Sequence, residues 1–477
     1  MLSAARELVA MALAQGAQFA EGRVVDQRQQ VIRSADGKAG ISESSTVGFG
    51  VRVLVDGHWG FASAGLSERS MAAAIVGQAI ALARAMPRRA RISRLAAAPV
   101  VKAVYETPCA EDPFLMATAE KMELAQAITQ AMVDASPLVI RSRATFDFRR
   151  EVSWLVTSQG TEVEQRLTTT GLTLAVVVER EGQVVERSYP AKNGDYGSGG
   201  FEVIRGLRPL EAAKQMVPEA IELLAAPTCE PQVTTVILDS TMMGNLIHET
   251  MGHSTELDRA LGDESDNFGP SFLQVSMLGS FQYASDIVTI FADATRPGGV
   301  ATYGYDHEGV PAQKFPLVER GIFKGYAMSR ESAEALGLAS NGTARASSWN
   351  RVPMDRITNL CLAPGTSTKD KLIAETDEGM YIDTVRGSDI DDRRLSFGFV
   401  GERGWRIRNG RIVGLVRRPV IYGESATFWR NCTGIAGPEE DRVRGFFGCG
   451  KGLPWQFVAT GQGGPPARFE RVKVGGV

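Results

Sequence analysis

Two regions of the chain alternate apolar and polar residues, and stretches with helical spacing surround them. The alternation from Arg23 to Ala62 is interrupted at Asp36-Gly37 and Asp56-Gly57, dipeptides that are typical of hairpin turns. A second alternating region covers residues 138–188. Apolar residues three and four apart predict helices at the start of the chain and over residues 67–86, 113–135 and 209–225. The first half is therefore predicted to be mixed α/β, with antiparallel sheets and long helices.

The pattern changes after the proline-flanked segment from Pro227 to Pro231. The run from Val233 to Leu238 indicates a buried strand, and the rest of the chain consists of short apolar runs separated by glycine-containing turns. We therefore predict two domains, an N-terminal α/β domain over residues 1–226 and a β-rich C-terminal domain over residues 227–477. The expected fold class is α+β.

Composition and charge exclude several classes of protein. The 477 residues are 44% hydrophobic and 22% charged, with 52 basic and 55 acidic side chains, so the formal net charge is −3. This balance gives no strong field for nucleic acid or anionic lipid, and the arginines between residues 84 and 94 lack the interleaved aromatic residues that stack on bases, which favours a solvated linker. No apolar run reaches the roughly 18 residues of a membrane span. We predict neither nucleic acid nor membrane as a partner.

The cysteines and the start of the chain suggest where the protein works. Five cysteines cannot all pair, and they are too sparse for a disulfide framework. The first 15 residues mix Arg6 and Glu7 with apolar residues at helical spacing, which favours an amphipathic helix over a signal peptide. We therefore expect a cytoplasmic protein.

Two of the four histidines fall on one predicted helix, directly after the strand that ends at Leu238. The segment His248-Glu249-Thr250-Met251-Gly252-His253 separates its histidines by five residues, which on a regular helix leaves them about 140° apart. A single π-type turn, or a helix that ends near Gly252, would bring them together. Neutral imidazoles suit zinc. The alternative is two unrelated, partly buried histidines with Glu249 as a surface acid.

A catalytic zinc site needs a third protein ligand and a base. Glu249 follows the first histidine and is positioned to take the proton of a zinc-bound water. Glu256 could reach the metal as a carboxylate, and a thiolate is the other option. Cys449 is the preferred cysteine because Gly448 and Gly450 flank it and Lys451 would favour its thiolate. Cys432 stays open as an alternative, whereas His58 and His307 lie in predicted turns and are not expected to bind metal.

These residues resemble the TldD branch of the TldD/PmbA zinc metallopeptidase family, which is marked by a His-Glu-x-x-x-His helix after a strand. The similarity extends to four further groups of residues: Glu256 and Asp258; Asp306 to Pro311; Pro353, Arg356, Thr358 and Asn359; and Cys449, Gly450 and Lys451. It implies that His248, His253 and Cys449 bind Zn²⁺ and that Glu249 is catalytic. It also implies that Glu256 and Asp258 support the ligands or replace one of them.

The resemblance further implies a cytoplasmic peptidase that acts on unfolded, leader or precursor peptides. It would work as a homodimer or as a heterodimer with a metal-free PmbA-type chain. The sequence departs from the family pattern at His307, at Leu453-Pro454-Trp455 and in the basic segment 403–411, which bears on the choice of substrate and partner. A deformylase-like enzyme would space its histidines four apart on a much smaller chain. A non-catalytic peptide-binding subunit would lack His248, Glu249 or His253, and all three are present.

Overall fold

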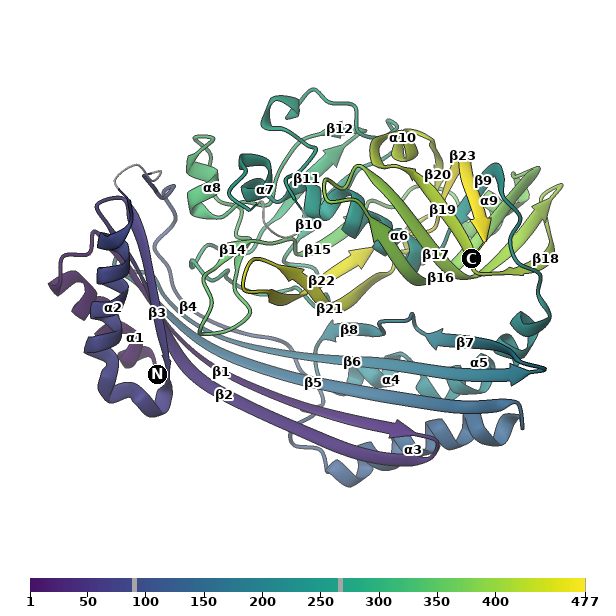
Figure 1. The fold of residues 1–477 in the computed structure, drawn as a ribbon, viewed down its shortest axis with the longest axis horizontal. Helices are drawn as coiled ribbons and strands as arrows, with labels where there is room; N and C mark the ends of the chain where they lie inside the picture. Colours follow the sequence, from purple (N-terminus) through teal and green to yellow (C-terminus); the bar gives the residue numbers. More distant parts are fainter. Residues whose placement is uncertain (88–91, 265–268, 477) are drawn as a thin grey trace.

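The computed structural model describes residues 1–87, 92–264 and 269–476. A long, curved sheet from the first half of the chain forms one side of the molecule, and the β-rich second half lies on the other side (Figure 1). The predicted α+β fold class is confirmed. Three arginines of the predicted basic linker, Arg88, Arg89 and Arg91, lie outside the described residues.

The N-terminal sheet is built on long antiparallel hairpins. Its strand order is β3-β2-β1-β5-β6-β4, and β7 and β8 also pair with β6. Asp36-Gly37 and Asp56-Gly57 connect its first three strands with positive φ at both residues of each turn, as a tight two-residue hairpin requires. The strands are β1 Phe19–Ala35, β2 Lys38–Val55, β3 His58–Gly65, β4 Lys102–Glu106, β5 Val139–Thr157, β6 Glu162–Arg180, β7 Gln183–Tyr189 and β8 Asp195–Ser198.

Side-chain alternation gives this sheet two different faces. Phe146 and Phe148 of β5 are fully buried in a cluster with α3 and α5, whereas Arg149 and Glu151 point into a cavity that faces the second half of the chain. The helices of this half are α1 Leu2–Ala14, α2 Ala72–Ala85, α3 Thr118–Ala135, α4 Glu202–Gly206 and α5 Pro209–Ala225. One face of the sheet therefore holds the apolar core and the other is free for polar residues.

Two helices begin later than the sequence predicts. A 3₁₀ turn over Leu66–Met71 precedes α2. The next helix is predicted from residue 113, but the Asp112 carboxylate accepts a hydrogen bond from the Phe114 N–H at 2.9 Å in a separate turn, and α3 begins at Thr118. At Asp112 a local side-chain turn competes with helix initiation, and at Leu66–Met71 a 3₁₀ turn takes the place of the first helical turn.

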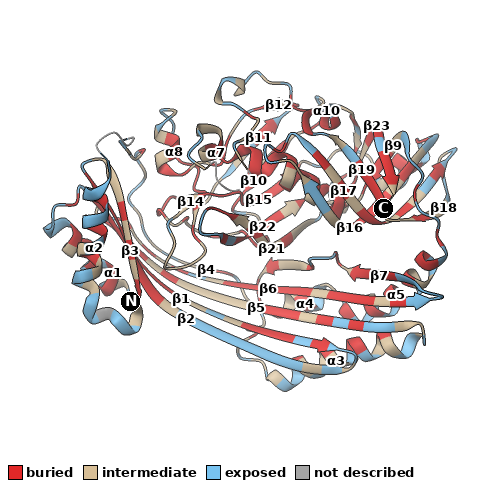
Figure 2. Cartoon of the chain, viewed as in Figure 1, coloured by how far each residue is buried: buried red, intermediate tan, exposed pale blue. Residues whose placement is uncertain are grey.

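Strand β2 leaves part of the sheet edge open. The short strand β3 pairs only with Gly48–Val55, and the preceding residues 38–46 are mostly exposed, as Figure 2 shows for the free end of β2. Their polar composition is the usual protection of an unpaired edge.

The second half contains two larger sheets. The first has the order β12-β11-β10-β15-β22-β21, which leaves β21 at its end. In the second, β16-β9-β23-β19-β17 is closed into a ring by additional pairing of β16 with β17, and β18 and β20 attach to it. The strands are β9 Gln232–Leu238, β10 Ile290–Asp293, β11 Lys314–Glu319, β12 Ile322–Phe323, β13 Ala344–Arg345, β14 Met354–Asp355, β15 Asn359–Leu362, β16 Glu378–Ile390, β17 Ser396–Arg408, β18 Arg411–Arg417, β19 Pro419–Glu424, β20 Cys432–Ile435, β21 Val443–Lys451, β22 Gln456–Gly463 and β23 Ala467–Gly476.

Short helices connect these strands. They are α6 Ser240–Ile247, α7 Leu257–Leu261, α8 Arg330–Glu334, α9 Lys369–Ala374 and α10 Ser425–Arg430. No helix in the described parts of the chain combines the length and the apolar composition needed to cross a bilayer.

Buried polar contacts join the two halves. Arg52 of β2 lies 2.9 Å from the carboxylate of Glu308, and Arg23 of β1 donates hydrogen bonds to the carbonyl oxygens of Ser348 and Arg351. Charged hydrogen bonds of this kind fix the orientation of the two halves relative to each other, because a misplaced partner would leave a charge buried without compensation.

Candidate metal centre

Helix α6 places the first histidine at a fixed position above strand β9. The Asp239 carboxylate ends the strand and caps the helix by accepting hydrogen bonds from the N–H groups of Thr241 and Met242, at 3.1 and 2.8 Å. The apolar face of α6 is fully buried in the core of the second half, through Met242, Met243, Leu246 and Ile247. The helix therefore has little freedom to rotate.

A π turn solves the spacing of the two histidines. Residues His248–Gly252 form it, and the His253 N–H donates to the His248 carbonyl five residues earlier. The ring centroids of His248 and His253 consequently lie 4.8 Å apart. Of the two arrangements that the sequence allows, the structure contains the π turn, followed by a short 3₁₀ turn over His253–Thr255.

Cys449 reaches the same point from the edge strand β21. Its Sγ lies 3.5 Å from His253 Nε2, and one donor atom each from His248, His253 and Cys449 fall within 4.8 Å of one another. All three side chains are buried. The flanking glycines are needed for packing, because a Cβ at Gly448 would come within 2.2 Å of the Phe446 ring.

The donor set fits zinc. Ligand distances of about 2.0–2.3 Å in a tetrahedral site place donor atoms roughly 3.3–3.8 Å apart, which matches the Sγ to Nε2 separation. His248 Nδ1 is buried without a hydrogen-bond partner among the described residues. Burial also lowers the pKa of His248, against the opposing effect of Glu249, and so favours the neutral imidazole that binds metal.

Arg356 is the cation that contacts the thiol. Its Nη2 donates to the Cys449 carbonyl at 2.6 Å and to Sγ at 3.0 Å. Burial acts to raise the pKa of Cys449, but His253 and Arg356 outweigh it and hold the pKa below its usual range. The sequence pointed to Lys451 for this task, and that expectation is wrong. The Lys451 ammonium instead binds the Asp258 carboxylate at 2.6 and 2.7 Å and the Asp355 carbonyl.

Glu256 lies behind the second histidine. Its fully buried carboxylate is 3.0 Å from His253 Nδ1, which leaves Nε2 directed at Cys449. Arg259, Lys451 and Arg356 lie 2.9, 3.4 and 3.6 Å from the same carboxylate. Burial acts to raise the pKa of Glu256, yet Lys451, His253 and Arg259 hold it well below its usual range. A carboxylate in this position orients an imidazole and increases its basicity.

Glu249 is half-buried and lines a cavity of about 110 Å³ together with His248. A water molecule or a substrate in this cavity could therefore contact the Glu249 carboxylate. Cys432 lies outside the cluster, in β20, where burial raises the pKa of its thiol to about 12.

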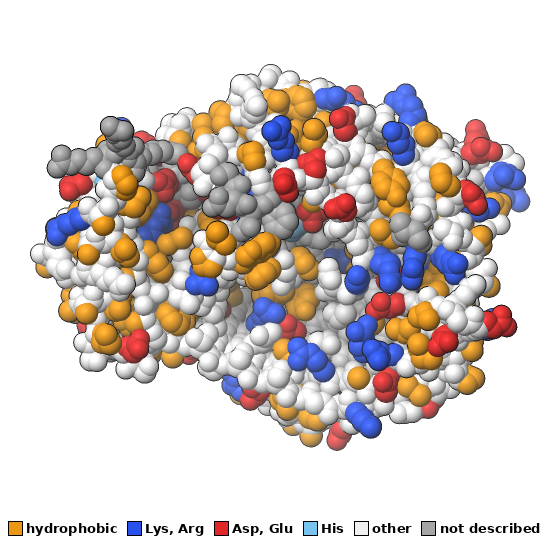
Figure 3. All heavy atoms as spheres, viewed as in Figure 1, with side chains coloured by type: hydrophobic (Ala, Val, Ile, Leu, Met, Phe, Trp, Pro, Cys, Tyr) orange, Lys and Arg blue, Asp and Glu red, His pale blue; other side chains and the backbone are white. Residues whose placement is uncertain are grey.

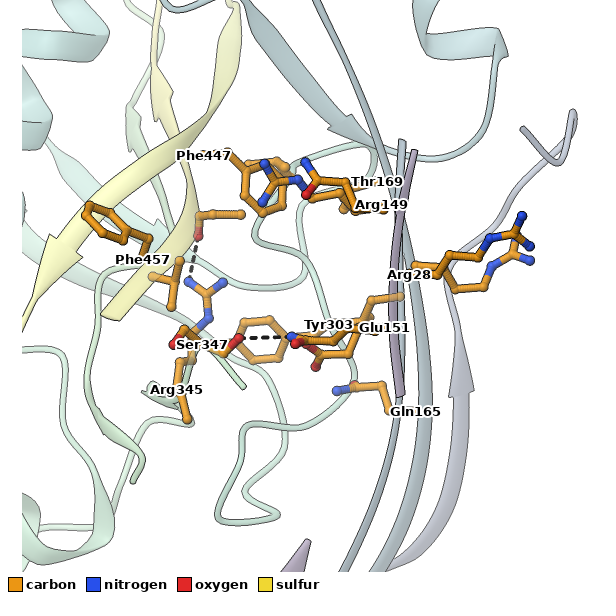
Figure 4. A pocket seen from close by; sticks show the side chains of 18 of the residues that line it. Arg28, Arg149, Glu151, Gln165, Thr169, Tyr303, Arg345, Ser347, Phe447 and Phe457 are labelled. Carbon is orange, nitrogen blue, oxygen red and sulfur yellow. Dashed lines mark hydrogen bonds between the residues drawn. The ribbon is translucent and has the colours of Figure 1, made fainter. Parts of the chain in front are cut away.

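A second cavity, of about 310 Å³, lies between the polar face of the long sheet and the second half of the chain. Figure 4 shows side chains from both halves facing one another across it: Arg149, Glu151 and Gln165 from the sheet, and Tyr303, Arg345, Phe447 and Phe457 from the opposite side. It reaches Val458, the residue that pairs with Cys449 across the β21–β22 hairpin. The cavity therefore lies one strand away from Cys449.

His307 lines this cavity, and the Leu453–Trp455 segment lies at the tip of the β21–β22 hairpin. His307 Nδ1 accepts a hydrogen bond from the Ala346 N–H, and its Nε2 lies 3.6 Å from Glu151. Leu453 and Trp455 are exposed at the turn between β21 and β22.

Sequence reasoning gave no role to Arg356 or to the cavity residues of the long sheet. The signal for Arg356 was its place in the segment from Pro353 to Asn359. Nothing local marked Arg149 or Glu151.

Comparisons with known proteins identify similar chains and a shared fold. Three family models match the chain: the PmbA/TldA metallopeptidase domain 1 over residues 20–85, the central domain over 111–225 and the C-terminal domain over 231–476. A metalloprotease of Methanothermobacter thermautotrophicus is 30% identical over 461 residues, 96% of each chain. A zinc metalloprotease TldD homolog of Saccharolobus solfataricus is 27% identical over 50% of this chain and 51% of its own. The crystal structure of TldE from Thermococcus kodakarensis has a TM-score of 0.75 at 16% identity and covers 99% of this chain and 100% of its own, so it shows a shared fold.

Proposed function

The chain belongs to the PmbA/TldD metallopeptidase family, and from this membership we propose that it is a zinc-dependent peptidase that hydrolyses unstructured peptides. The observation that supports this best is the convergence of His248, His253 and Cys449 beside a cavity that Glu249 lines. A non-catalytic binding subunit would have no use for this set of donors.

Each residue has a distinct part in the proposed reaction. Zinc bound by His248, His253 and Cys449 would supply Lewis-acid activation of a water molecule. Glu249 acts as the general base and holds the proton at its carboxylate before passing it to the leaving amine. Glu256 orients His253, and Arg356 favours the thiolate of Cys449. These two residues act through the ligands and are positioning residues.

The position of β21 supports an extended substrate. As the last strand of its sheet, β21 could pair with an added peptide strand through its remaining backbone groups, although the Cys449 carbonyl accepts from Arg356 and the Gly445 N–H donates to Asp195. The 310 Å³ cavity gives side chains room on the other side of the hairpin. Leader and precursor peptides, which lack folded structure, are the proposed natural class of substrate.

We also propose a cytoplasmic location and a dimeric assembly. All five cysteines are free thiols, in keeping with a reducing compartment. The partner is proposed to be a second copy of this chain or a PmbA-type chain.

Glu249→Gln tests the proposal directly. The substitution removes the base but leaves the three donors in place, so the variant should retain zinc and lose peptide hydrolysis by about 10²- to 10⁴-fold. The measurement combines metal analysis with kcat/KM on an internally quenched peptide. Glu230→Gln, at an exposed glutamate outside the cluster, is the matched control and should behave like the parent. Full activity in a zinc-loaded Glu249→Gln protein would overturn the assignment.

A further inference from the structure

The small cavity beside Glu249 is lined by basic side chains from three separate segments. One face of α6 and the turn that follows contributes Thr241, Asn245, His248 and Glu249. Opposite them lie Lys192 from the loop before β8, Arg386 from β16 and Arg444 from β21. In Figure 3 the molecule is hollowed between its two halves, and Lys and Arg side chains gather beside the hollow.

The basic groups of this cavity are only partly balanced by carboxylates, since Arg444 interacts with the buried Asp195 and Asp239 but forms no direct ion pair with either in the described structure. Arg386 has a carboxylate partner, Glu186, at 3.6 Å. The ion pairs found among the described residues include none for Lys192 or Arg444. The acid that lines the cavity is Glu249, which the proposed reaction uses as a base. Positive groups that converge in a partly dehydrated site favour the binding of an anion.

Two polar groups on the cavity lining also lack partners. Arg444 Nη1 and Asn245 Nδ2 are both buried, and neither has a hydrogen-bond partner in the described structure. Leaving such donors unsatisfied is unfavourable, and in native proteins an unmet donor commonly indicates a missing ligand, ion or water. Asn245 and Arg444 both line this cavity, so one ligand there could meet both donors, although Arg444 also borders the neighbouring cavity of Asp239 and Asp383.

We propose that this cavity is a carboxylate-binding subsite next to the scissile bond. Arg444 binds the carboxylate through its guanidinium, Asn245 donates a further hydrogen bond, and Lys192 attracts the group at the exposed rim. The carboxylate belongs either to the C-terminus of the substrate or to an Asp or Glu side chain adjacent to the cleaved bond. This inference rests on the proposed peptidase function and narrows its substrates.

Two sets of peptides of equal length separate the two sources. In the first set, a peptide with a free C-terminal carboxylate is compared with the same sequence as an amide. In the second set, all peptides are amidated, and each Glu peptide is compared with the Gln peptide substituted at the same position, with that position moved stepwise along the chain. We expect kcat/KM to favour a carboxylate over its neutral match by roughly 10-fold or more, as a charge-assisted hydrogen bond would give. A preference confined to the free acid indicates trimming from the C-terminus. A preference for Glu indicates cleavage beside an acidic residue. Equal rates throughout would overturn the subsite.

Substitutions at Arg444 tie the preference to this cavity. Arg444→Gln should reduce the carboxylate preference to near 1, and Arg444→Lys should restore part of it because the charge is kept. Arg442→Gln, at an exposed arginine two residues earlier, is the control and should retain the full preference. Circular dichroism and zinc content establish that the variants are folded. An unchanged preference in folded Arg444→Gln would contradict the proposal.

A binding measurement separates this inference from the peptidase assignment. In the zinc-loaded Glu249→Gln protein, calorimetry should show tighter binding of the carboxylate peptide than of its amide. Preferential binding without hydrolysis by the parent protein would support the subsite and reject the peptidase function. Hydrolysis and binding without any preference would reject the subsite alone.

Discussion

Cys449 enters the cluster from a strand 196 residues away from His253, and its surroundings make it a thiolate donor. The flanking glycines, visible in the sequence, allow aromatic rings to pack over the backbone beside it. The residue that places a cation beside the Cys449 sulfur could not be predicted from the neighbouring sequence. Lys451 is close in sequence, but the Asp258 carboxylate and the Asp355 carbonyl bind its ammonium, whereas Arg356 arrives from the segment after β14. Proximity along the chain was a poor guide to contact.

Cys449→Ser should remove most of the bound zinc. The parent is expected to hold about one zinc per chain, and a serine hydroxyl is a far weaker ligand than a thiolate because it stays protonated. His248→Ala and His253→Ala should have the same effect. Inductively coupled plasma mass spectrometry on protein purified without added zinc gives the occupancy, and Cys432→Ser is the matched control. Full occupancy in Cys449→Ser would move the third ligand to Glu256.

Glu256→Gln should weaken zinc binding without abolishing it. The variant keeps the shape of the side chain but removes the charge that orients His253, and loss of such a partner typically costs about 10- to 100-fold in metal affinity. Competition with a chromophoric chelator measures the change, and Glu375→Gln at an exposed position is the control. Complete loss of zinc from a folded protein would make Glu256 a direct ligand, and unchanged affinity would deny it a role.

At the scale of elements, the periodicity of apolar residues predicted which segments form helices and strands, but not the residue at which each helix begins. The alternating regions and their Asp-Gly turns correspond to β1, β2 and β3, and the five-residue spacing of the histidines indicated a π turn as one solution. The predicted starts of α2 and α3 at residues 67 and 113 lie before the observed ones, because a 3₁₀ turn over Leu66–Met71 and a side-chain turn at Asp112 come first. A capping residue marks a turn of the backbone but does not decide whether a helix follows at once.

Edge strand β21 leads us to expect a strong preference for unfolded chains. A substrate must present a free backbone to pair with this strand, and a folded domain has already paired its own. A small globular domain should therefore resist cleavage, while a destabilised variant of nearly identical sequence should be cleaved readily. Comparable rates for the two, measured by mass spectrometry of the products, would contradict the pairing model.

Peptides methylated on backbone nitrogens provide a sharper control for the same prediction. Successive N–H groups of a strand point to opposite sides. Methylation of alternate residues should therefore block cleavage in one register and be tolerated in the other.

At the scale of the molecule, the 310 Å³ cavity is a product of the two halves together. Its walls combine Arg149 and Glu151 of β5 with Arg345 and Phe457 of the second half, and its lining residues range from Gln27 to Ala459. Sequence patterns predict which residues share one face of a strand. They could not predict that the two halves enclose a cavity, because the relative placement of the halves depends on tertiary contacts such as Arg52 with Glu308.

The open edge of β2 is a natural place for a partner. Residues 38–46 carry unpaired backbone groups, and a dimer would cover exposed edges while restricting access to the site. We expect light scattering to give the mass of a dimer, either for this chain alone or after mixing with a PmbA-type chain. A monodisperse monomer with full activity at sub-micromolar concentration would show that no partner is required.

The order in which the site is assembled has a consequence for the life of the newly made chain. Strand β9, which presents α6, pairs with β23 near the C-terminus, and Cys449 lies on a late strand as well. A ribosome releases these segments last. While the polypeptide is still emerging, the histidines therefore have neither their thiol nor a finished platform. Under the proposed function, a chain therefore cannot cleave peptides until β21 and β23 have been made and its own site is complete.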